Sequence, residues 1–263
     1  MLNMEKQQYA VITGASAGIG MCFAKELAKR GYSLVLVARR KERLEALANE
    51  LKENYGTVSR IVVCDVSEKA ECERLIQEIE DIPVEIFINN AGFGDCSPFL
   101  QGDLEKELDM VDVNIKALHT LMKLMLKRMN TENRGYILNV ASSAGLLPAG
   151  PYMATYYATK AYVTSITQAV ARELTEAKSK VYVGCLCPGP VDTEFNQVAN
   201  VEFALKGITA EKCAQYGLKK MFQKKTVIVP TFPMKFLVFW VRLVPRKLYV
   251  AVTAKQQKRK LSQ

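Results

Sequence analysis

Short apolar segments alternate with amphipathic helical segments along most of this chain. Seven segments rich in Val, Ile, Leu and Phe predict buried strands, at residues 9–14, 32–38, 60–66, 85–92, 136–143, 180–189 and 226–229. Helical patterns lie between them, and Gly31 and Gly56 end the first two. Strands that are apolar on both faces and alternate with helices are typical of a parallel sheet covered on both sides. The pattern predicts an α/β fold, a single doubly wound domain over residues 1–263.

Two stretches depart from this alternation. Residues 194–225 contain no clear strand and precede the seventh one, so we interpret them as a substrate-covering segment near the carboxyl ends of the strands. Residues 230–263 form a basic, apolar C-terminal extension. Within residues 232–252 the longest uncharged run has six residues, far below the roughly 20 that span a bilayer, and Pro245 would break a helix. The extension either lies on a membrane surface or packs over the pocket or another subunit, and we favour packing.

The charge of the chain is distributed unevenly. The net charge is +9, and 13 of the 36 basic residues but none of the 27 acidic ones lie in residues 212–263. The body is therefore nearly neutral, whereas the end of the chain is strongly basic. This asymmetry suggests an anionic partner such as a membrane surface or an acidic ligand, but we favour a solvated basic end without a partner.

The seven cysteines do not indicate a disulfide framework. No CxxC pair occurs, and Cys185 and Cys187 would share one face of a strand. Buried thiols in a reducing compartment are the simpler interpretation. Because no long apolar region precedes the first strand, we expect no secretory signal and a cytoplasmic location.

The sequence TGASAGIG, residues 13–20, joins the first predicted strand to the first helix. Glycines at this position allow a tight turn and let a pyrophosphate approach the amides of a helix N-terminus. The strand before the loop and the helix after it favour a dinucleotide site of the Rossmann type. The residues expected to bind the cofactor here are Gly14, Ser16, Gly18, Ile19 and Gly20.

The end of the second strand indicates which dinucleotide is bound. An NAD site usually carries a carboxylate there for the ribose hydroxyls, but this chain has Arg39 and Arg40. A guanidinium binds a 2′-phosphate that a carboxylate would repel, and the Ser16 hydroxyl can assist. NADP(H) is therefore favoured over NAD(H), unless the two arginines only cap the strand and face solvent.

The motifs together resemble those of the short-chain dehydrogenase/reductase family, most closely its classical type. After TGASAGIG come CDV at residues 64–66, NNAG at 89–92, Asn114, SS at 142–143, YYATK at 156–160 and PGPVDT at 188–193. They follow the order and spacing of the family over residues 13–193, and the C-terminal third carries little of this signal.

The resemblance implies a Tyr-x-x-x-Lys active site, which only Tyr156 and Lys160 satisfy. Residues at i and i+4 share one face of a helix, so the ammonium can lie near the phenol and lower its pKa. The phenol can then exchange a proton with a carbonyl or an alcohol. We expect Tyr157 to pack against the sheet or a subunit interface.

The catalytic serine can be assigned in two ways. The commonest separation between serine and tyrosine in the family points to Ser143, whereas the local S-x-A-G frame points to Ser142. Because side chains alternate along a strand, only one of the two would face the substrate. We favour Ser142.

Further site residues follow from the resemblance alone. Asn114 matches a fourth catalytic residue that helps to hold a water in a proton relay; otherwise it caps or kinks a helix. The cofactor-binding matches are Asp65 and Val66, Asn89 and Gly92, and Pro188, Gly189, Val191 and Thr193. His119, the only histidine, lies in an apolar helical stretch, and we interpret it as structural. No cluster of residues suggests a metal site.

The resemblance implies an NADP(H)-dependent oxidoreductase that moves a hydride between nicotinamide and a carbonyl or secondary alcohol. Tyr156 would act as acid and base, Ser142 would orient the carbonyl, and Lys160 would tune Tyr156 and hold the nicotinamide ribose. The pocket would form from residues 144–155 and 194–225. A homodimer or homotetramer through the helices that carry Asn114 and Tyr156 is implied, and we expect no nucleic-acid partner. Two alternatives remain: a membrane-associated lipid or acyl-chain reductase, and a catalytically idle NADP-binding regulator.

Overall fold

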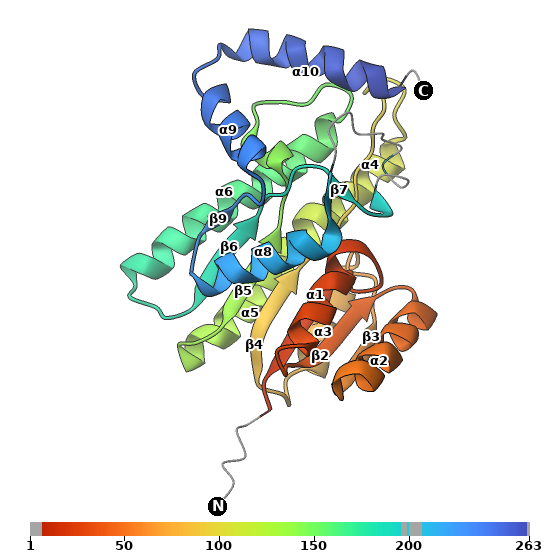
Figure 1. The fold of residues 1–263 in the computed structure, drawn as a ribbon, viewed down its shortest axis with the longest axis vertical. Coiled ribbons are helices and arrows are strands. Elements are labelled where there is room, and N and C mark those ends of the chain that lie inside the picture. Colours follow the sequence, from red (N-terminus) through yellow and green to blue (C-terminus); the bar gives the residue numbers. More distant parts are fainter. Residues whose placement is uncertain (1–6, 196–198, 200–206, 262–263) are drawn as a thin grey trace, which may run out of the picture.

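A seven-stranded parallel sheet forms the centre of the molecule (Figure 1). The structure, a computed structural model, describes residues 7–195, 199 and 207–261. The strand order is β3 (Ser59–Val63), β2 (Ser33–Ala38), β1 (Tyr9–Thr13), β4 (Val84–Asn89), β5 (Tyr136–Val140), β6 (Tyr182–Leu186) and β9 (Val227–Ile228). The predicted doubly wound α/β fold with about seven strands is confirmed.

Helices cover both faces of the sheet because successive strand residues point to opposite sides. Ala10 and Ile12 of β1 belong to one core and Val11 to the other. Helices α1 (Gly18–Ala28), α2 (Lys41–Tyr55) and α8 (Ala210–Phe222) enclose the first core. Helices α3 (Lys69–Glu78), α5 (Leu118–Glu132) and α6 (Ala154–Glu176) enclose the second.

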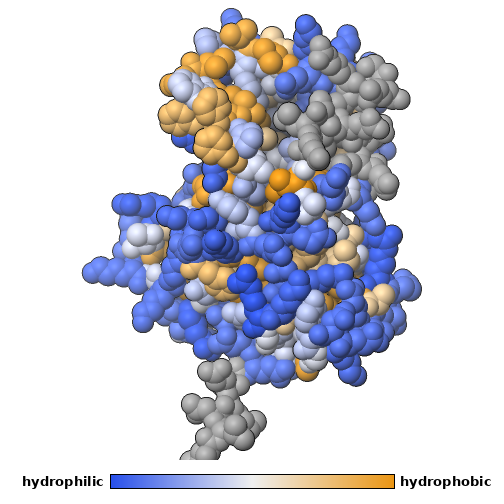
Figure 2. All heavy atoms as spheres, in the orientation of Figure 1, coloured by the Kyte–Doolittle hydropathy of each residue, from blue (hydrophilic) through white to orange (hydrophobic). Residues whose placement is uncertain are grey.

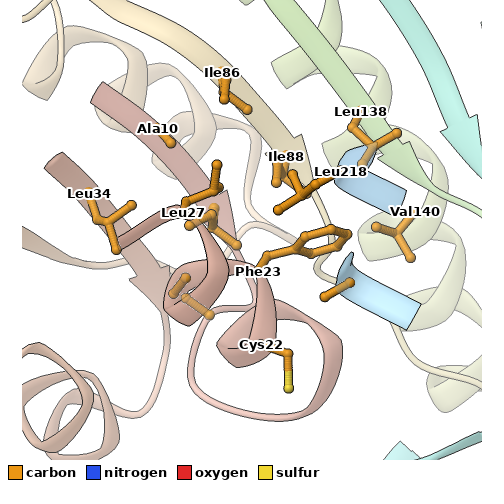
Figure 3. Close-up of a cluster of buried hydrophobic side chains, with 14 of the residues drawn as sticks. Ala10, Cys22, Phe23, Leu27, Leu34, Ile86, Ile88, Leu138, Val140 and Leu218 are labelled. Atoms are coloured by element: carbon orange, nitrogen blue, oxygen red, sulfur yellow. The ribbon is translucent and has the colours of Figure 1, made fainter. Parts of the chain in front are cut away.

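Helix α8 packs closely on α1 and on the sheet. Phe23 of α1 is fully buried, and Figure 3 shows its ring reaching toward Ile88 of β4 and Leu218 of α8. A Cβ at Gly217 would lie 3.2 Å from Leu186 Cδ2 and 3.4 Å from Phe23 Cζ, so only a small residue allows this approach. Most of the described part of the expected substrate-covering segment, residues 194–225, therefore builds the core instead.

The chain reverses its winding direction at β1, which lies between β2 and β4. In open α/β sheets such a reversal leaves a crevice at the carboxyl ends of the strands, where ligands bind. After β6 the chain forms a separate two-stranded sheet from β7 (Val191–Asp192) and β8 (Ile208–Thr209). Residues 196–198 and 200–206 of the same segment lie outside the described residues.

Two irregular helical turns lie beside the crevice. The π-helix η1 (Asp112–Ala117) joins α4 (Leu104–Val111) to α5, and the 3₁₀-helix η2 (Ser143–Leu146) follows β5. A π-helical turn inside an α-helix often marks a functional position, because it redirects the side chains that it carries.

The C-terminal extension folds into two helices, α9 (Phe232–Val241) and α10 (Arg246–Leu261). They are separated at Pro245, as predicted. Figure 1 places both at the end of the molecule beyond the carboxyl edge of the sheet. Within the residues that the structure describes, no helix is long and apolar enough to cross a bilayer.

Candidate active site

A cavity of about 1210 Å³ opens at the carboxyl ends of the strands. It extends from the glycine loop before α1 to the inner side of α9 and α10. The structure brings most of the sequence-predicted site residues to its wall: Gly14, Ser16, Gly18, Ile19, Arg39, Arg40, Asp65, Val66, Gly92, Ser142, Tyr156, Lys160, Pro188, Gly189, Val191 and Thr193. The other three, Gly20, Asn89 and Asn114, lie behind this wall.

The glycine loop has a shape that only glycine adopts easily. Gly14 has φ +66° and Gly18 has φ +54°, and a Cβ on Gly14 would lie 2.9 Å from Ala91 Cα. A Cβ on Gly20 would lie 2.3 Å from the Gly14 carbonyl oxygen, so Gly20 supports the loop from behind. The loop leads directly into α1, where free backbone amides attract an anion. This geometry fits the pyrophosphate of a dinucleotide.

Arg39 and Arg40 flank the same end of the cavity but have different partners. The Arg39 side chain is 75% exposed, with Nη1 3.4 Å from Asp65 Oδ2. Arg40 Nη2 donates to Ser16 Oγ at 3.0 Å, and its Nη1 donates to Glu194 Oε2 at 3.2 Å. Glu194 also pairs with Arg43 at 2.6 Å. Arg39 is therefore the less engaged of the two cavity-lining guanidinium groups.

Asp65 is fixed by a turn at the end of β3. Its Oδ1 accepts hydrogen bonds from the Ser67 amide at 3.1 Å and from the Ser67 hydroxyl at 2.8 Å. Burial acts to raise the pKa of Asp65, but these bonds and the nearby Arg39 lower it overall. The carboxylate is thus ionised and held at the edge of the cavity.

Tyr156 and Lys160 lie one helical turn apart on the buried face of α6. Lys160 Nζ lies 5.9 Å from the centre of the Tyr156 ring and donates to the Val140 carbonyl at 3.1 Å. Burial raises the pKa of the Tyr156 phenol to about 12 and lowers the pKa of the Lys160 amine to about 8. The expected lowering of the phenol pKa is therefore not found, because desolvation of the charged form dominates.

The two serines have different surroundings. The Ser142 hydroxyl accepts a hydrogen bond from the Ala144 amide at 3.1 Å, and its hydrogen bond with Tyr156 opposes the rise of the phenol pKa caused by burial. Ser143 is 8% exposed, and its amide donates to the Pro188 carbonyl at 2.7 Å. Both line the cavity, because β5 ends at Val140 and strand alternation no longer applies.

Asn114 is completely buried in the π-helix η1. Its Nδ2 donates to the Phe93 carbonyl at 2.9 Å and to Thr159 Oγ1 at 3.1 Å, and its Oδ1 accepts from the Phe93 amide at 3.1 Å. A Cβ on Gly92 would lie 2.8 Å from Asn114 Oδ1 and 3.2 Å from Lys160 Nζ. Gly92 thus separates two polar groups that converge on one point.

Asn90, rather than Asn89, faces the cavity. Asn89 ends β4, is 2% exposed and donates from Nδ2 to Asn139 Oδ1 at 2.9 Å. Asn90 Nδ2 donates to the carbonyl oxygens of Thr13 and Gly14 at 3.0 and 3.2 Å and so holds the glycine loop. Because side chains alternate along a strand, the sequence could have indicated that only one of Asn89 and Asn90 would face the cavity.

Tyr157 lies in the wall of the cavity. Its hydroxyl accepts a hydrogen bond from Gln257 Nε2 of α10 at 3.2 Å, and a Cβ on Gly150 would meet its ring at 2.3 Å. The structure thus places Tyr157 in the cavity wall and not against the sheet, because α10 folds back over α6, which local sequence patterns do not indicate. Gln257 is 5% exposed and also lines the cavity.

The far end of the cavity is largely apolar. Met153, Phe195, Met234 and Leu237 line it, and Met234 and Leu237 belong to α9. The C-terminal extension thus packs over the cavity. Glu194 and Phe195 are the residues of segment 194–225 that reach the cavity in the described part of the chain.

The single histidine lies apart from the cavity, whereas one of the seven cysteines, Cys64, is part of its wall. His119 is exposed on α5, where its Nδ1 lies 2.7 Å from the Tyr162 hydroxyl oxygen. All seven cysteines are buried and none forms a disulfide. In the described part of the chain, no group of three His, Cys, Asp or Glu side chains is placed to hold a metal ion.

Comparison with known proteins gives a consistent picture. The family model described as short chain dehydrogenase matches residues 8–202. A very-long-chain 3-oxoacyl-CoA reductase of Anas platyrhynchos is 34% identical over 201 residues, 74% of this chain and 63% of that protein. The chain thus spans less than two thirds of the length of this relative. An uncharacterized oxidoreductase of Staphylococcus epidermidis is 35% identical over 73% of this chain and 81% of that protein.

A solved structure extends the likeness to the whole fold. A short-chain dehydrogenase from Sphingobium yanoikuyae in complex with NADPH has a TM-score of 0.81 at 30% identity, covering 88% of this chain and 92% of that one. The family match ends at residue 202, so α9 and α10 lie beyond it.

Proposed function

Because the chain belongs to the short-chain dehydrogenase family, whose members oxidise alcohols or reduce carbonyls with a nicotinamide cofactor, we propose that it is NADP(H)-dependent and that Tyr156 is its acid and base. One observation carries the proposal. The Tyr156 phenol and the Ser142 hydroxyl meet at one part of a cavity whose other end has a glycine loop and two arginines.

The phenol is suited to give a proton to a carbonyl oxygen. With a pKa raised to about 12 by burial, Tyr156 is protonated at neutral pH. The hydride is supplied by the reduced nicotinamide when the cofactor is bound. Ser142 donates a hydrogen bond to the same carbonyl oxygen and fixes its direction. In the reverse reaction, the phenolate form of Tyr156 accepts the proton of the alcohol and becomes the neutral phenol.

Lys160 and Asn114 support the proton transfer from behind. Lys160 Nζ is held by the Val140 carbonyl, close to Gly92 and Asn114 Oδ1. An ammonium there stabilises the phenolate that forms when Tyr156 gives up its proton. Asn114 holds the Phe93 backbone through two hydrogen bonds. Its amide oxygen lies on the side of Lys160 from which a proton would return to the Tyr156 phenolate.

The arginines support the preference for NADP(H). Arg39 is mostly exposed and has one long ion pair, so its guanidinium can turn to a 2′-phosphate. Ser16 lies beside Arg40 and adds a hydroxyl donor. The likeness to a structure in complex with NADPH agrees with this assignment.

The apolar end of the cavity favours a substrate with a sizeable apolar part. Met153, Phe195, Met234 and Leu237 offer hydrophobic contact beyond the point where the carbonyl would lie. This composition, together with the 34% identity to a very-long-chain 3-oxoacyl-CoA reductase, makes an acyl chain the second candidate substrate class. A keto group on a compact ring or chain is the first.

A cofactor titration combined with a turnover assay tests the proposal. NADPH and NADH binding are measured by fluorescence for the wild type, Arg39→Ala and Arg43→Ala. Arg39→Ala should weaken NADPH binding about 10–150-fold, because one charge-assisted hydrogen bond contributes about 1.5–3 kcal/mol. NADH binding should be nearly unchanged. Arg43 of α2, which pairs with Glu194, is the matched control, and its substitution should change the binding of both cofactors little.

Turnover separates an enzyme from a regulator. NADPH oxidation is followed by absorbance with ketones of increasing apolar size and with 3-oxoacyl thioesters of increasing chain length. Reduction of any of them, lost in Tyr156→Phe, supports the proposal. Tight NADPH binding with no turnover across the panel would favour the idle regulator. Equal affinity of the wild type for NADPH and NADH would refute the NADP preference.

We also infer a homodimer or homotetramer formed through α5 and α6. The outer sides of these helices present exposed polar groups, and His119 and Tyr162 link them. Sedimentation velocity on the wild type tests the assembly, with a purely monomeric protein as the contrary outcome. A cytoplasmic location stays an expectation from the sequence.

A further inference from the structure

The outer side of α9 is aromatic where a water-facing helix would be polar. Phe232, Phe236, Phe239 and Trp240 are 77%, 56%, 60% and 47% exposed, and Lys235 is the one charged residue of this helix. Figure 2 shows apolar side chains gathered at the end of the molecule where Figure 1 places α9 and α10. Large contiguous apolar patches of this kind mark interaction surfaces.

The aromatic side chains are held in place by the packing of the opposite side. Met234 and Val238, on the inner side of α9, are each 8% exposed and pack against Leu118, Val163 and Cys187. The Trp240 ring centre lies 5.7 Å from those of both Phe236 and Phe239. Helix α9 is therefore docked, and its second apolar side remains open.

Positive charge follows directly after the aromatic residues. Arg242, Arg246, Lys247, Lys255 and Lys258 are exposed, and none forms an ion pair with another described residue. The chain has no acidic residue after Glu211. Exposed Leu243 and Leu248 lie between these cations. Aromatic and aliphatic groups beside unpaired cations complement a surface of anionic headgroups over hydrocarbon.

This charge pattern argues against a second copy as the partner. A symmetric dimer through this face would bring the same patch of each chain together. Its unpaired cations would then face one another, with no carboxylate on the same segment to offset them. A partner made of anionic lipid has the opposite charge and also accepts the exposed aromatic rings.

We propose that the outer side of α9 and the adjoining start of α10, called here the C-terminal face, docks on a lipid bilayer rich in anionic headgroups. The ten residues of α9 are about 15 Å long. A helix of this length does not span the hydrocarbon core of about 30 Å but can lie in its interface. The inference does not depend on the proposed reaction, although the inner sides of the same helices line the cavity.

Trp240 offers a direct test because it is the only tryptophan of the chain. The full-length protein is mixed with vesicles of phosphatidylcholine alone or with 30 mol% phosphatidylglycerol added. With the anionic vesicles, Trp240 emission should shift to shorter wavelength and its quenching by acrylamide should fall. Raising the salt concentration should reverse part of the binding, since headgroup attraction is screened.

Matched variants separate the two parts of the surface. Arg242→Gln/Arg246→Gln/Lys247→Gln should weaken binding to anionic vesicles about 100-fold, because each cation near such a surface contributes about 1 kcal/mol. The control removes an equal charge elsewhere on the surface, with Lys69→Gln on α3, Arg172→Gln on α6 and Arg134→Gln between α5 and β5, and should change binding little.

The apolar part is tested in the same way. Phe236→Ser and Phe239→Ser should each weaken binding about tenfold, whereas Val58→Ser and Val63→Ser, at exposed positions of the β3 region, should not. All of these side chains are exposed, so their substitution should leave the fold intact. Circular dichroism and NADPH binding check that it does.

Three results would overturn the proposal. One is an unchanged Trp240 spectrum with anionic vesicles. The second is equal binding by the wild type and the three-cation variant. The third is protection of Trp240 from acrylamide that rises with protein concentration in the absence of lipid, which would assign the C-terminal face to a second copy of the chain.

Discussion

Adjacent tyrosines in α6 have different tasks because a helix turns them about 100° apart. Tyr156 meets Ser142 and Lys160, whereas the Tyr157 hydroxyl meets Gln257 of α10. Tyr156→Phe should lower kcat by about 10³-fold or more while NADPH affinity stays within about twofold, because the proton donor alone is lost. Tyr157→Phe should change kcat little. Steady-state kinetics and NADPH titration measure both, and an equal loss of kcat in the two variants at unchanged stability would contradict the assignment.

The serine pair allows a second comparison within one turn. Ser142→Ala should lower kcat by about 10²–10³-fold, the range found when a donor to a developing oxyanion is removed. Ser143→Ala should have a much smaller effect, since the contact found for Ser143 in the structure runs through its backbone amide to Pro188. Single-turnover reduction of one good substrate by both variants gives the ranking. The opposite ranking would assign the role to Ser143.

At the residue scale, the sequence predicts which motifs lie at the cavity better than it predicts which side chain of a motif faces it. The glycine loop, the arginines, Tyr156 and Lys160 all reach the cavity as predicted. Asn89 does not, because the last residue of β4 points into the core while Asn90 turns outward. Tyr157 and Gln257 were beyond prediction, since their contact joins residues 100 positions apart in the sequence.

Gly20 acts through the shape of an element and not through contact with a ligand. A methyl group there would lie 2.3 Å from the Gly14 carbonyl oxygen and 2.5 Å from Asn90 Nδ2. Overpacking of this kind costs about 1–3 kcal/mol, so Gly20→Ala should weaken NADPH and NADH about equally, by roughly 5–150-fold. This pattern differs from that of Arg39→Ala, which should affect NADPH alone.

The control for the loop is Gly31→Ala. Gly31 also has positive φ, at +83°, but a Cβ there meets nothing within 4 Å. Its substitution should lower the free energy of unfolding by about 1 kcal/mol through backbone strain and leave cofactor affinity unchanged. If Gly20→Ala weakened NADPH binding selectively, the main contribution of the loop would be the contact of Ser16 with the 2′-phosphate and not the binding of the pyrophosphate.

At the element scale, periodicity predicts strands well and covering segments poorly. All seven strands of the central sheet come from apolar runs that local sequence identifies, whereas the two-residue strands β7 and β8 are not predicted. Segment 194–225 shows no clear strand in the sequence and is therefore interpreted as a cover, yet it contains β8, and its helix α8 packs on α1 through Gly217 and Leu218. Amphipathic helices that build a core and helices that cover a pocket have the same period, so periodicity cannot distinguish them.

At the scale of the whole molecule, the cavity and the two C-terminal helices lie at one end. The carboxyl ends of the strands form the cavity, and α9 and α10 close over it with their inner sides. Sequence reasoning posed covering and membrane contact as alternatives for the extension. The structure shows the packing over the cavity, and a membrane contact stays compatible with it, because Met234 and Val238 are buried while Phe236 and Phe239 are exposed on the same helix.

Buried thiols across the whole core should make stability depend on pH. Burial raises the pKa of Cys22 and Cys64 to about 11 and the pKa of Cys72 and Cys213 to about 12, from a usual value near 9. Above pH 9 the unfolded chain loses these protons and the folded chain keeps them. The unfolded state then binds fewer protons, so the free energy of unfolding falls as pH rises.

Lys160 acts in the opposite direction over part of the same range. Burial lowers the pKa of its amine to about 8 in the folded chain, so between pH 8 and about 10.5 the unfolded state binds more protons and stability rises with pH. The four thiols outweigh the one amine, and Cys187, whose pKa is raised by its contact with Cys185 and by burial, acts in the same direction as they do. Between pH 9 and pH 10 the free energy of unfolding should therefore fall by a few kcal/mol, since one pKa unit corresponds to about 1.36 kcal/mol for each group.

Urea unfolding at pH 8, 9 and 10 measures how the free energy of unfolding changes with pH. Variants that lack one titrating group show how much that group contributes to this change. Cys213→Ala should reduce the loss between pH 9 and pH 10 by about 1 kcal/mol, because one titrating thiol is gone. Leu218→Ala in the same helix is the matched control: it also opens the core, but it carries no proton and should lower stability equally at every pH. Lys160→Met should steepen the loss, because the opposing amine is removed. A wild-type stability that rises from pH 8 to pH 10 would mean that the thiols ionise as easily in the folded chain as in the unfolded one and that only the effect of Lys160 remains, which the burial of all these thiols opposes.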